Sequence, residues 1–318
     1  MEKPRSVVPS SSAPRAPVAR SASGARPCVE EPFIQAAEVW LPQGTGLRHQ
    51  SGFYGRHGSF ARASFVTTFE RGQGLPGTAF ETARAQLCPS IQPDSPRNRR
   101  ALDAGLESAL ALPVVREREV LAVVVFWAGR VGRSSLAIWN ARGSPASCSD
   151  RCGGSGDVLR VAQSMAERSA VSGLPVFEMP AQGTTGSTSA SPPGGLALPN
   201  VGRRGSDEVI TLVGSAAAPW ARAFELWLPN ARGQLSLDHS YYGPGLSEFA
   251  TASQGLNFEP GEGLPGRVYE SGLPLVFVGV HARPFVRAEA AEGAGLEYGI
   301  GIPFFEGAKV SAVLTWLG

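Results

Sequence analysis

Two stretches of the chain share one pattern of hydrophobic and polar positions. Each begins with an alternating segment, Glu-Val-Trp-Leu-Pro at 38–42 and Glu-Leu-Trp-Leu-Pro at 225–229. Alternation puts every second side chain on one face, so we expect a strand with one buried face. Near the end of the first stretch, residues 120–126 are apolar at every position. This run predicts a strand that is buried on both faces.

The repeat continues along both stretches. Gly-Gln-Gly-Leu-Pro-Gly at 72–77 returns as Gly-Glu-Gly-Leu-Pro-Gly at 261–266, and Ala-Gly-Leu-Glu at 104–107 returns at 294–297. The spacing between the copies stays nearly constant, which indicates two copies of one domain rather than a solenoid of short repeats.

Either copy predicts the element order ββαβαββ. This order makes an α+β fold, an antiparallel sheet of five to six strands flanked by helices. A short helix is expected after each Leu-Pro-Gly, where proline occupies the first helical turn. The other expected strands are 47–53, 87–91, 107–115 and 119–127 in the first copy and 234–241, 275–278, 297–305 and 309–317 in the second, with helices at 97–104 and 287–294.

Composition sets the expected domain boundaries. With 39 glycines and 26 prolines in 318 residues, long stretches outside the copies are expected to stay unpacked. We expect a disordered tail at 1–29, a first domain at 30–128, a partly disordered Gly/Ser/Pro-rich linker at 129–205 and a second domain at 206–318. Within the linker, an apolar face at 157–169 predicts a short helix. We expect the second domain to lack the closing helix that would follow its last strand.

Charge and hydropathy exclude several partners. The formal net charge is only +2, so we expect no nucleic-acid partner. The longest apolar run, 120–128, is far shorter than the roughly 20 residues that span a bilayer, so no membrane partner is expected. Four cysteines are too few for a disulfide scaffold, which favours a reducing compartment. We expect a cytoplasmic protein, with organelle targeting by the arginine-rich tail as the alternative.

The motifs that could carry chemistry favour structural interpretations. Both Gly-x-Gly-x-x-Gly segments match the dinucleotide fingerprint but lack a preceding buried strand, so we expect tight loops whose glycines take positive φ. Cys148 and Cys152 have no further ligands nearby and the four histidines are scattered, so no metal site is expected. Cys88, which aligns with Phe277, is interpreted as a structural cysteine. No catalytic motif is found, and we expect no enzyme.

Aromatic residues cluster in the second copy. Two interpretations stay open for them, core packing or the lining of a ligand pocket. The candidate pocket comprises four of these aromatics and the loop 262–265: Phe249, Phe258, Phe285, Tyr298 and Glu262.

Together, the Trp-Leu-Pro strand, the Gly-x-Gly-Leu-Pro-Gly segment, the Ala-Gly-Leu segment and the apolar last strand resemble GAF domains. The likeness covers 34–128 and 206–318. The resemblance implies a sensor module with a ligand cleft beside an antiparallel sheet, which often dimerises and regulates an attached domain. The Asn-Lys-x-x-Phe-Asp-Glu signature of cyclic-nucleotide members is absent, as is a Cys-His pair for a bilin, so the cofactor is unknown.

We therefore expect a non-catalytic tandem sensor that acts in signalling by binding a small molecule or a protein partner, with a homodimer as a further expectation. Three alternatives remain. The chain is a ligand-free dimerisation scaffold, a fragment of a larger kinase or transcription regulator, or an enzyme like the free methionine sulfoxide reductases that uses Cys88.

Overall fold

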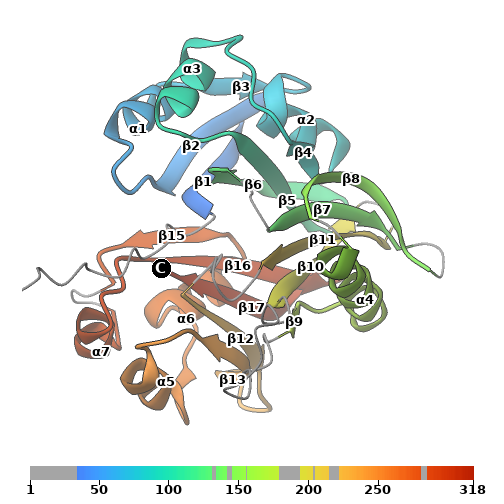
Figure 1. The fold of residues 1–318 in the computed structure, drawn as a ribbon. Helices are drawn as coiled ribbons and strands as arrows, with labels where there is room; N and C mark the ends of the chain where they lie inside the picture. Colours follow the sequence, from blue (N-terminus) through green and yellow to red (C-terminus); the bar gives the residue numbers. More distant parts are fainter. Residues whose placement is uncertain are drawn as a thin grey trace, which may run out of the picture.

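The computed structural model describes residues 34–130, 134–141, 145–154, 156–178, 194–202, 205–214, 222–280 and 285–318. The expected tail at 1–29 lies outside the described residues. Within the described residues the chain forms three antiparallel sheets. Figure 1 shows the N-terminal sheet at the top, the C-terminal sheet at the bottom and the third sheet between them.

The first domain has a six-stranded sheet in the order β3-β2-β1-β6-β5-β4. Its helices cover one face of the sheet (Figure 1). The elements are β1 (Ile34–Gln43), β2 (Gly46–Phe53), α1 (Gly58–Phe65), β3 (Thr68–Glu70), α2 (Gly74–Thr82), β4 (Gln86–Cys88), α3 (Pro96–Asp103), β5 (Ser108–Arg116) and β6 (Glu119–Ala128).

The second domain repeats this topology with the order β14-β13-β12-β17-β16-β15. Even the register shifts recur, between Val39 and Trp40 in β1 and between Leu226 and Trp227 in β12. The elements are β12 (Ala223–Pro229), β13 (Leu235–Tyr242), α5 (Ser247–Ser253), β14 (Asn257–Phe258), α6 (Gly263–Ser271), β15 (Leu275–Val278), α7 (Ala288–Gly293), β16 (Tyr298–Glu306) and β17 (Lys309–Leu317).

Both domains confirm the α+β fold with antiparallel sheets. The predicted order ββαβαββ lacks one helix and one short edge strand in each domain. These are α1 and β3 in the first domain and α5 and β14 in the second. These elements are only two to eight residues long. Such short segments have too few positions to show a clear hydrophobic period.

The segment predicted as a linker forms a third sheet over its described residues, in the order β8-β7-β11-β10-β9. The predicted division between residues 205 and 206 separates β11 from this sheet, because β11 pairs with β7 and β10 and not with the second domain. The helix expected at 157–169 is confirmed as α4. The elements are β7 (Ser135–Asn140), β8 (Ser147–Gly153), α4 (Gly156–Ser172), β9 (Val176–Glu178), β10 (Gly194–Gly202) and β11 (Gly205–Gly214).

We call this third sheet, β7 to β11, the central sheet. Its strand order matches that of the two domains, except that it has no counterpart of the edge strands β3 and β14 among the described residues. A sequence signal for it exists: Leu-Ala-Leu-Pro occurs at 110–113 in β5 and again at 196–199 in β10. In addition, Trp139 and Trp227 each donate from Nε1 to a threonine hydroxyl, of Thr211 at 2.8 Å and of Thr315 at 3.2 Å. The central sheet therefore repeats the strand arrangement of the two domains in a shortened form.

The three sheets pack against one another through the faces that carry no helix. This shared core contains residues of every sheet, among them Leu110, Ile210 and Ile300. The rings of Phe126 and Trp316 stack across it with centroids 5.1 Å apart. Helices therefore lie on the outside of the molecule, as Figure 1 shows.

One buried carboxylate joins the first domain to the central sheet. Glu208 on β11 accepts hydrogen bonds from Arg84 Nε at 2.6 Å and from the Ala85 amide at 3.3 Å, both in the turn after α2. Asn200 on β10 donates to the same carboxylate at 3.0 Å. The end of α2 is thereby fixed to the central sheet.

Among the described residues, no helix is both long enough and apolar enough to cross a membrane.

Candidate functional site

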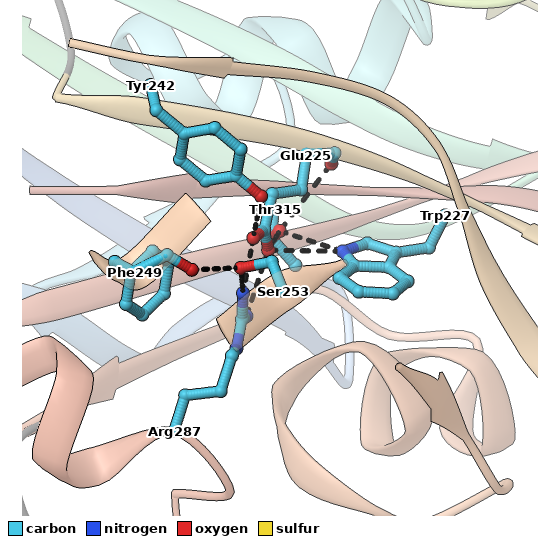
Figure 2. A network of polar contacts seen from close by, with 7 residues as sticks. All are labelled: Glu225, Trp227, Tyr242, Phe249, Ser253, Arg287 and Thr315. Carbon is cyan, nitrogen blue, oxygen red and sulfur yellow. Dashed lines mark hydrogen bonds and ion pairs between the residues drawn. The ribbon is translucent and has the colours of Figure 1, made fainter. Parts of the chain in front are cut away.

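A buried glutamate–arginine pair lies between sheet and helices in the second domain. Glu225 projects from β12, and Arg287 stands immediately before α7 and forms an ion pair with it. The hydroxyls of Tyr242 and Thr315 donate to the same carboxylate at 2.7 and 3.0 Å. Arg287 also donates to Ser253 of α5, and Figure 2 shows these groups converging on Glu225.

The first domain contains the same arrangement. Glu38 on β1 forms an ion pair with Arg97 of α3 and accepts from Tyr54 at 3.0 Å and Trp127 at 2.9 Å. Arg97 Nε donates to Ser64 of α1 at 3.1 Å. Each network therefore connects the sheet with two helices. The signal that could have revealed it is the recurrence of Glu-x-Trp together with an arginine at the start of the last helix.

The electrostatics of the pair keep both glutamates ionised. Burial by itself raises the pKa of Glu225, but the charge of Arg287 and the hydrogen bonds outweigh it, so the pKa lies below its ordinary value. Burial also raises the pKa of Glu38, and Arg97 lowers it in the same way, with the same net direction. Each arginine also lies over an aromatic ring. The guanidinium carbon of Arg97 is 4.6 Å from the ring centroid of Trp127, and that of Arg287 is 4.4 Å from the ring centroid of Phe249.

The structure separates the residues of the candidate pocket. Phe249, Phe258 and Phe285 come together in the core between sheet and helices, around Arg287. Tyr298 lies on the opposite face of the sheet, where it stacks on Phe53 of the first domain at 3.7 Å. Glu262 is exposed and accepts from the Glu259 amide at 3.0 Å. Only the three phenylalanines share one environment, and there they pack as core.

A cleft of about 580 Å³ lies in the first domain. It lies where the first turns of α2 and α3 face β4 and the sheet, and Arg97 contributes to its wall. Phe69, Leu75 and Trp127 supply an apolar lining. Its polar groups include Gln73 and Asn98 at the starts of the two helices.

Two residues that line the cleft differ between the copies. Cys88 pairs with Ala109 on the neighbouring strand, and Phe277 pairs with the equivalent Gly299. Ser95 stands two residues before Arg97, where Phe285 stands before Arg287. The rings of Phe277 and Phe285 lie 6.1 Å apart and fill the second domain where the first has a thiol and a hydroxyl.

The cleft is polar at its helix ends and carries no dominant charge. Neither α2 nor α3 has an acidic residue in its first turn, and the carboxylate of Asp94, just before α3, lines the cleft beside them. Asp94 accepts a hydrogen bond from the side-chain Nδ2 of Asn98 at 2.8 Å. Burial raises the pKa of the Cys88 thiol. Among the described residues there is no cluster of three or more metal-ligating side chains.

Solved structures similar to this chain cover about a third of it. The GAF domain of A. aeolicus nlh2 in an inactive state shares 24% identity over 31% of this chain and 58% of its own, with a TM-score of 0.26. The S. aureus fRMsr in complex with substrate shares 18% identity over 30% of this chain and 56% of its own, with a TM-score of 0.24. An NreA protein of S. aureus, mutated in its nitrate binding site, shares 15% identity over 30% of this chain and 73% of its own, with a TM-score of 0.26.

No curated protein matches the sequence. The alignment spans little more than half the length of the first two solved structures. The family model of the GAF domain matches residues 29–138, and the second domain repeats the sheet of the first strand for strand. Residues 29–138 of this chain are therefore a GAF domain.

Proposed function

We propose that the chain is a regulatory protein that senses a small molecule in the cleft of its first domain and acts without turning it over. A GAF domain indicates a ligand-binding sensory or regulatory role. The observation that carries the proposal is the cleft itself, which is open beside Cys88 and Ser95, whereas Phe277 and Phe285 fill the equivalent place in the second domain. The second copy then has a structural role.

The lining favours a ligand with a flat apolar body and a polar edge. A volume of about 580 Å³ lies within the roughly 300–1,000 Å³ of small-molecule sites. Phe69 and Trp127 offer aromatic surface to the body of the ligand, while Gln73 and Asn98 offer amide groups to its edge. The expectation of a homodimer stays a prediction.

Binding can reach the rest of the molecule through α2. A ligand in the cleft contacts the first turn of α2, and the turn after its last residue is held by Glu208 of the central sheet. Such a ligand shifts the protein only by the difference in its affinity for two arrangements of α2. This route supports a regulatory rather than a purely structural role for the first domain.

The test compares ligand binding by the purified full chain with that of a filled-cleft variant. Native mass spectrometry identifies co-purifying molecules. A thermal-shift assay then tests planar amides and heterocyclic acids as ligands. Ser95→Phe and, separately, Cys88→Phe introduce the aromatic side chains found in the second domain, and we expect either to abolish binding. Ser59→Phe, on the exposed side of α1, is the matched control and should bind normally.

Unchanged affinity in both filled-cleft variants would rule out the cleft as the binding site. Chemical conversion of the bound molecule, lost on Cys88→Ala, would show instead that the domain is catalytic.

A further inference from the structure

Two cysteines lie at neighbouring edges of different sheets. Cys88 ends β4, the edge strand of the first sheet, and Cys152 lies on β8, the edge strand of the central sheet. The Cys152 thiol donates to the carbonyl oxygen of Pro89, the residue that follows Cys88, at 3.6 Å. Both thiols are reduced and half-buried. The two sheet edges therefore bring a pair of thiols to one boundary.

We propose that Cys88 and Cys152 form a reversible disulfide that joins the GAF domain to the central sheet. Two thiols lose two hydrogens and form one S–S bond. The oxidant is a disulfide such as oxidised glutathione, which leaves as two reduced glutathiones, or hydrogen peroxide, which leaves as two waters. A dithiol reductant restores both thiols. Because Cys88 also lines the cleft, the bond fixes one wall of the cleft to the central sheet.

The other described cysteine is a poorer partner. Cys148 lies four residues before Cys152 on the same strand, so their Cα atoms are roughly 12 Å apart. A disulfide needs Cα atoms within about 7 Å. Cys148 is exposed, and its thiol donates to the Asp150 carbonyl at 3.4 Å. Strand geometry therefore excludes a bond between Cys148 and Cys152, whereas Cys152 contacts the residue next to Cys88.

The environment of the thiols makes the reaction pH-dependent. Burial raises the pKa of Cys88 and of Cys152 above the ordinary value of 9.0. The carboxylates of Asp94 and Asp150 raise the pKa of Cys88 further, and Cys88, Asp150 and Glu107 raise that of Cys152. The attacking species is the thiolate, so oxidation is slow at neutral pH and accelerates as the pH rises toward and beyond that value.

The test uses the full chain with the other two cysteines removed, Cys28→Ser/Cys148→Ser. Oxidised glutathione should lower the intact mass by two hydrogens, and protease digestion should give one peptide pair linking Cys88 to Cys152, which dithiothreitol releases. The oxidised form should melt several degrees higher, because the bond closes a long loop. In the matched variants with Cys88→Ser or Cys152→Ser added, only a glutathione adduct should form.

Separate glutathione adducts on Cys88 and Cys152 in the native protein, or a link that appears only in urea, would overturn the proposal. Neither outcome bears on ligand binding in the cleft, so the disulfide and the sensor function fail independently.

Discussion

At the scale of single residues, the two domains depend on the same buried charge pair. Glu38 and Glu225 are fully buried, and each is paired with an arginine whose side chain is almost fully buried. A buried ion pair does not stabilise a fold more than apolar residues of the same size would, but loss of one partner is costly. These pairs therefore set which helices and strands must come together.

Arg287→Met should destabilise the protein by about 3–5 kcal/mol, because it leaves the buried Glu225 carboxylate without its counter-charge. Urea unfolding measures the loss. The control is Arg116→Met, which breaks an exposed pair with Glu119 and should change stability by less than about 1 kcal/mol. Equal effects of the two variants would show that Glu225 does not depend on Arg287.

Stability should fall in acid through Glu38 and Glu225. Their folded-state pKa values lie below the ordinary 4.5, so the stability that their ionised forms contribute is complete above about pH 4.5. It is lost as the pH falls through the lower folded-state values. Urea midpoints measured from pH 7 to pH 3 should show this decline. Glu225→Gln should make the decline shallower, whereas Glu119→Gln, at an exposed carboxylate, should leave it unchanged.

At the scale of elements, the Gly-x-Gly-Leu-Pro-Gly segment begins a helix in both domains. Its first two glycines have positive φ, 74° and 60° at Gly72 and Gly74, which confirms the predicted loop. The third is required for another reason. A Cβ on Gly77 would collide with the backbone carbonyl of Glu70, and Gly266 stands in the same relation to Glu259.

Gly77→Ala should therefore cost roughly 1–3 kcal/mol and displace the start of α2, which lines the cleft. Thermal unfolding measures the loss of stability. Gly58→Ala is the matched control, because its Cβ would meet only the end of the Arg62 side chain at 3.8 Å, and it should be neutral or stabilising. A neutral Gly77→Ala would contradict the close approach of the two backbones.

At the scale of the whole molecule, three sheets share one core, so they should unfold as one unit. Ile210 of β11 faces the shared core, whereas its neighbour Val209 faces α4. Ile210→Ala should cost about 2–5 kcal/mol and reduce hydrogen-exchange protection in β5 and β16 as well as in β10. Val209→Ala should reduce it mainly around α4. Protection lost only within the central sheet in both variants would contradict a common core.

Much of the fold was predictable from the chain, because repeated alternation marks strands wherever one face is buried. The strands around Trp40 and Trp227 and the helices that begin near Arg97 and Arg287 follow directly from such patterns. The cleft was not predictable in the same way. Aromatic density indicated the second domain, but aromatics such as Phe285 fill space, and the open volume lies where Cys88 and Ser95 are small.

By itself, the sequence determined that the chain contains two copies of one α+β domain and which strand faces are apolar, since both are local properties of residue order. Only the tertiary structure decided that the Gly- and Ser-rich middle segment is a third sheet. Its strands gain stability by burying one face against sheets distant in sequence, and the one recurring segment, Leu-Ala-Leu-Pro at 196–199, does not by itself record that contribution. The position of the cleft was likewise decided by packing, because a cavity depends on which side chains fail to fill a space.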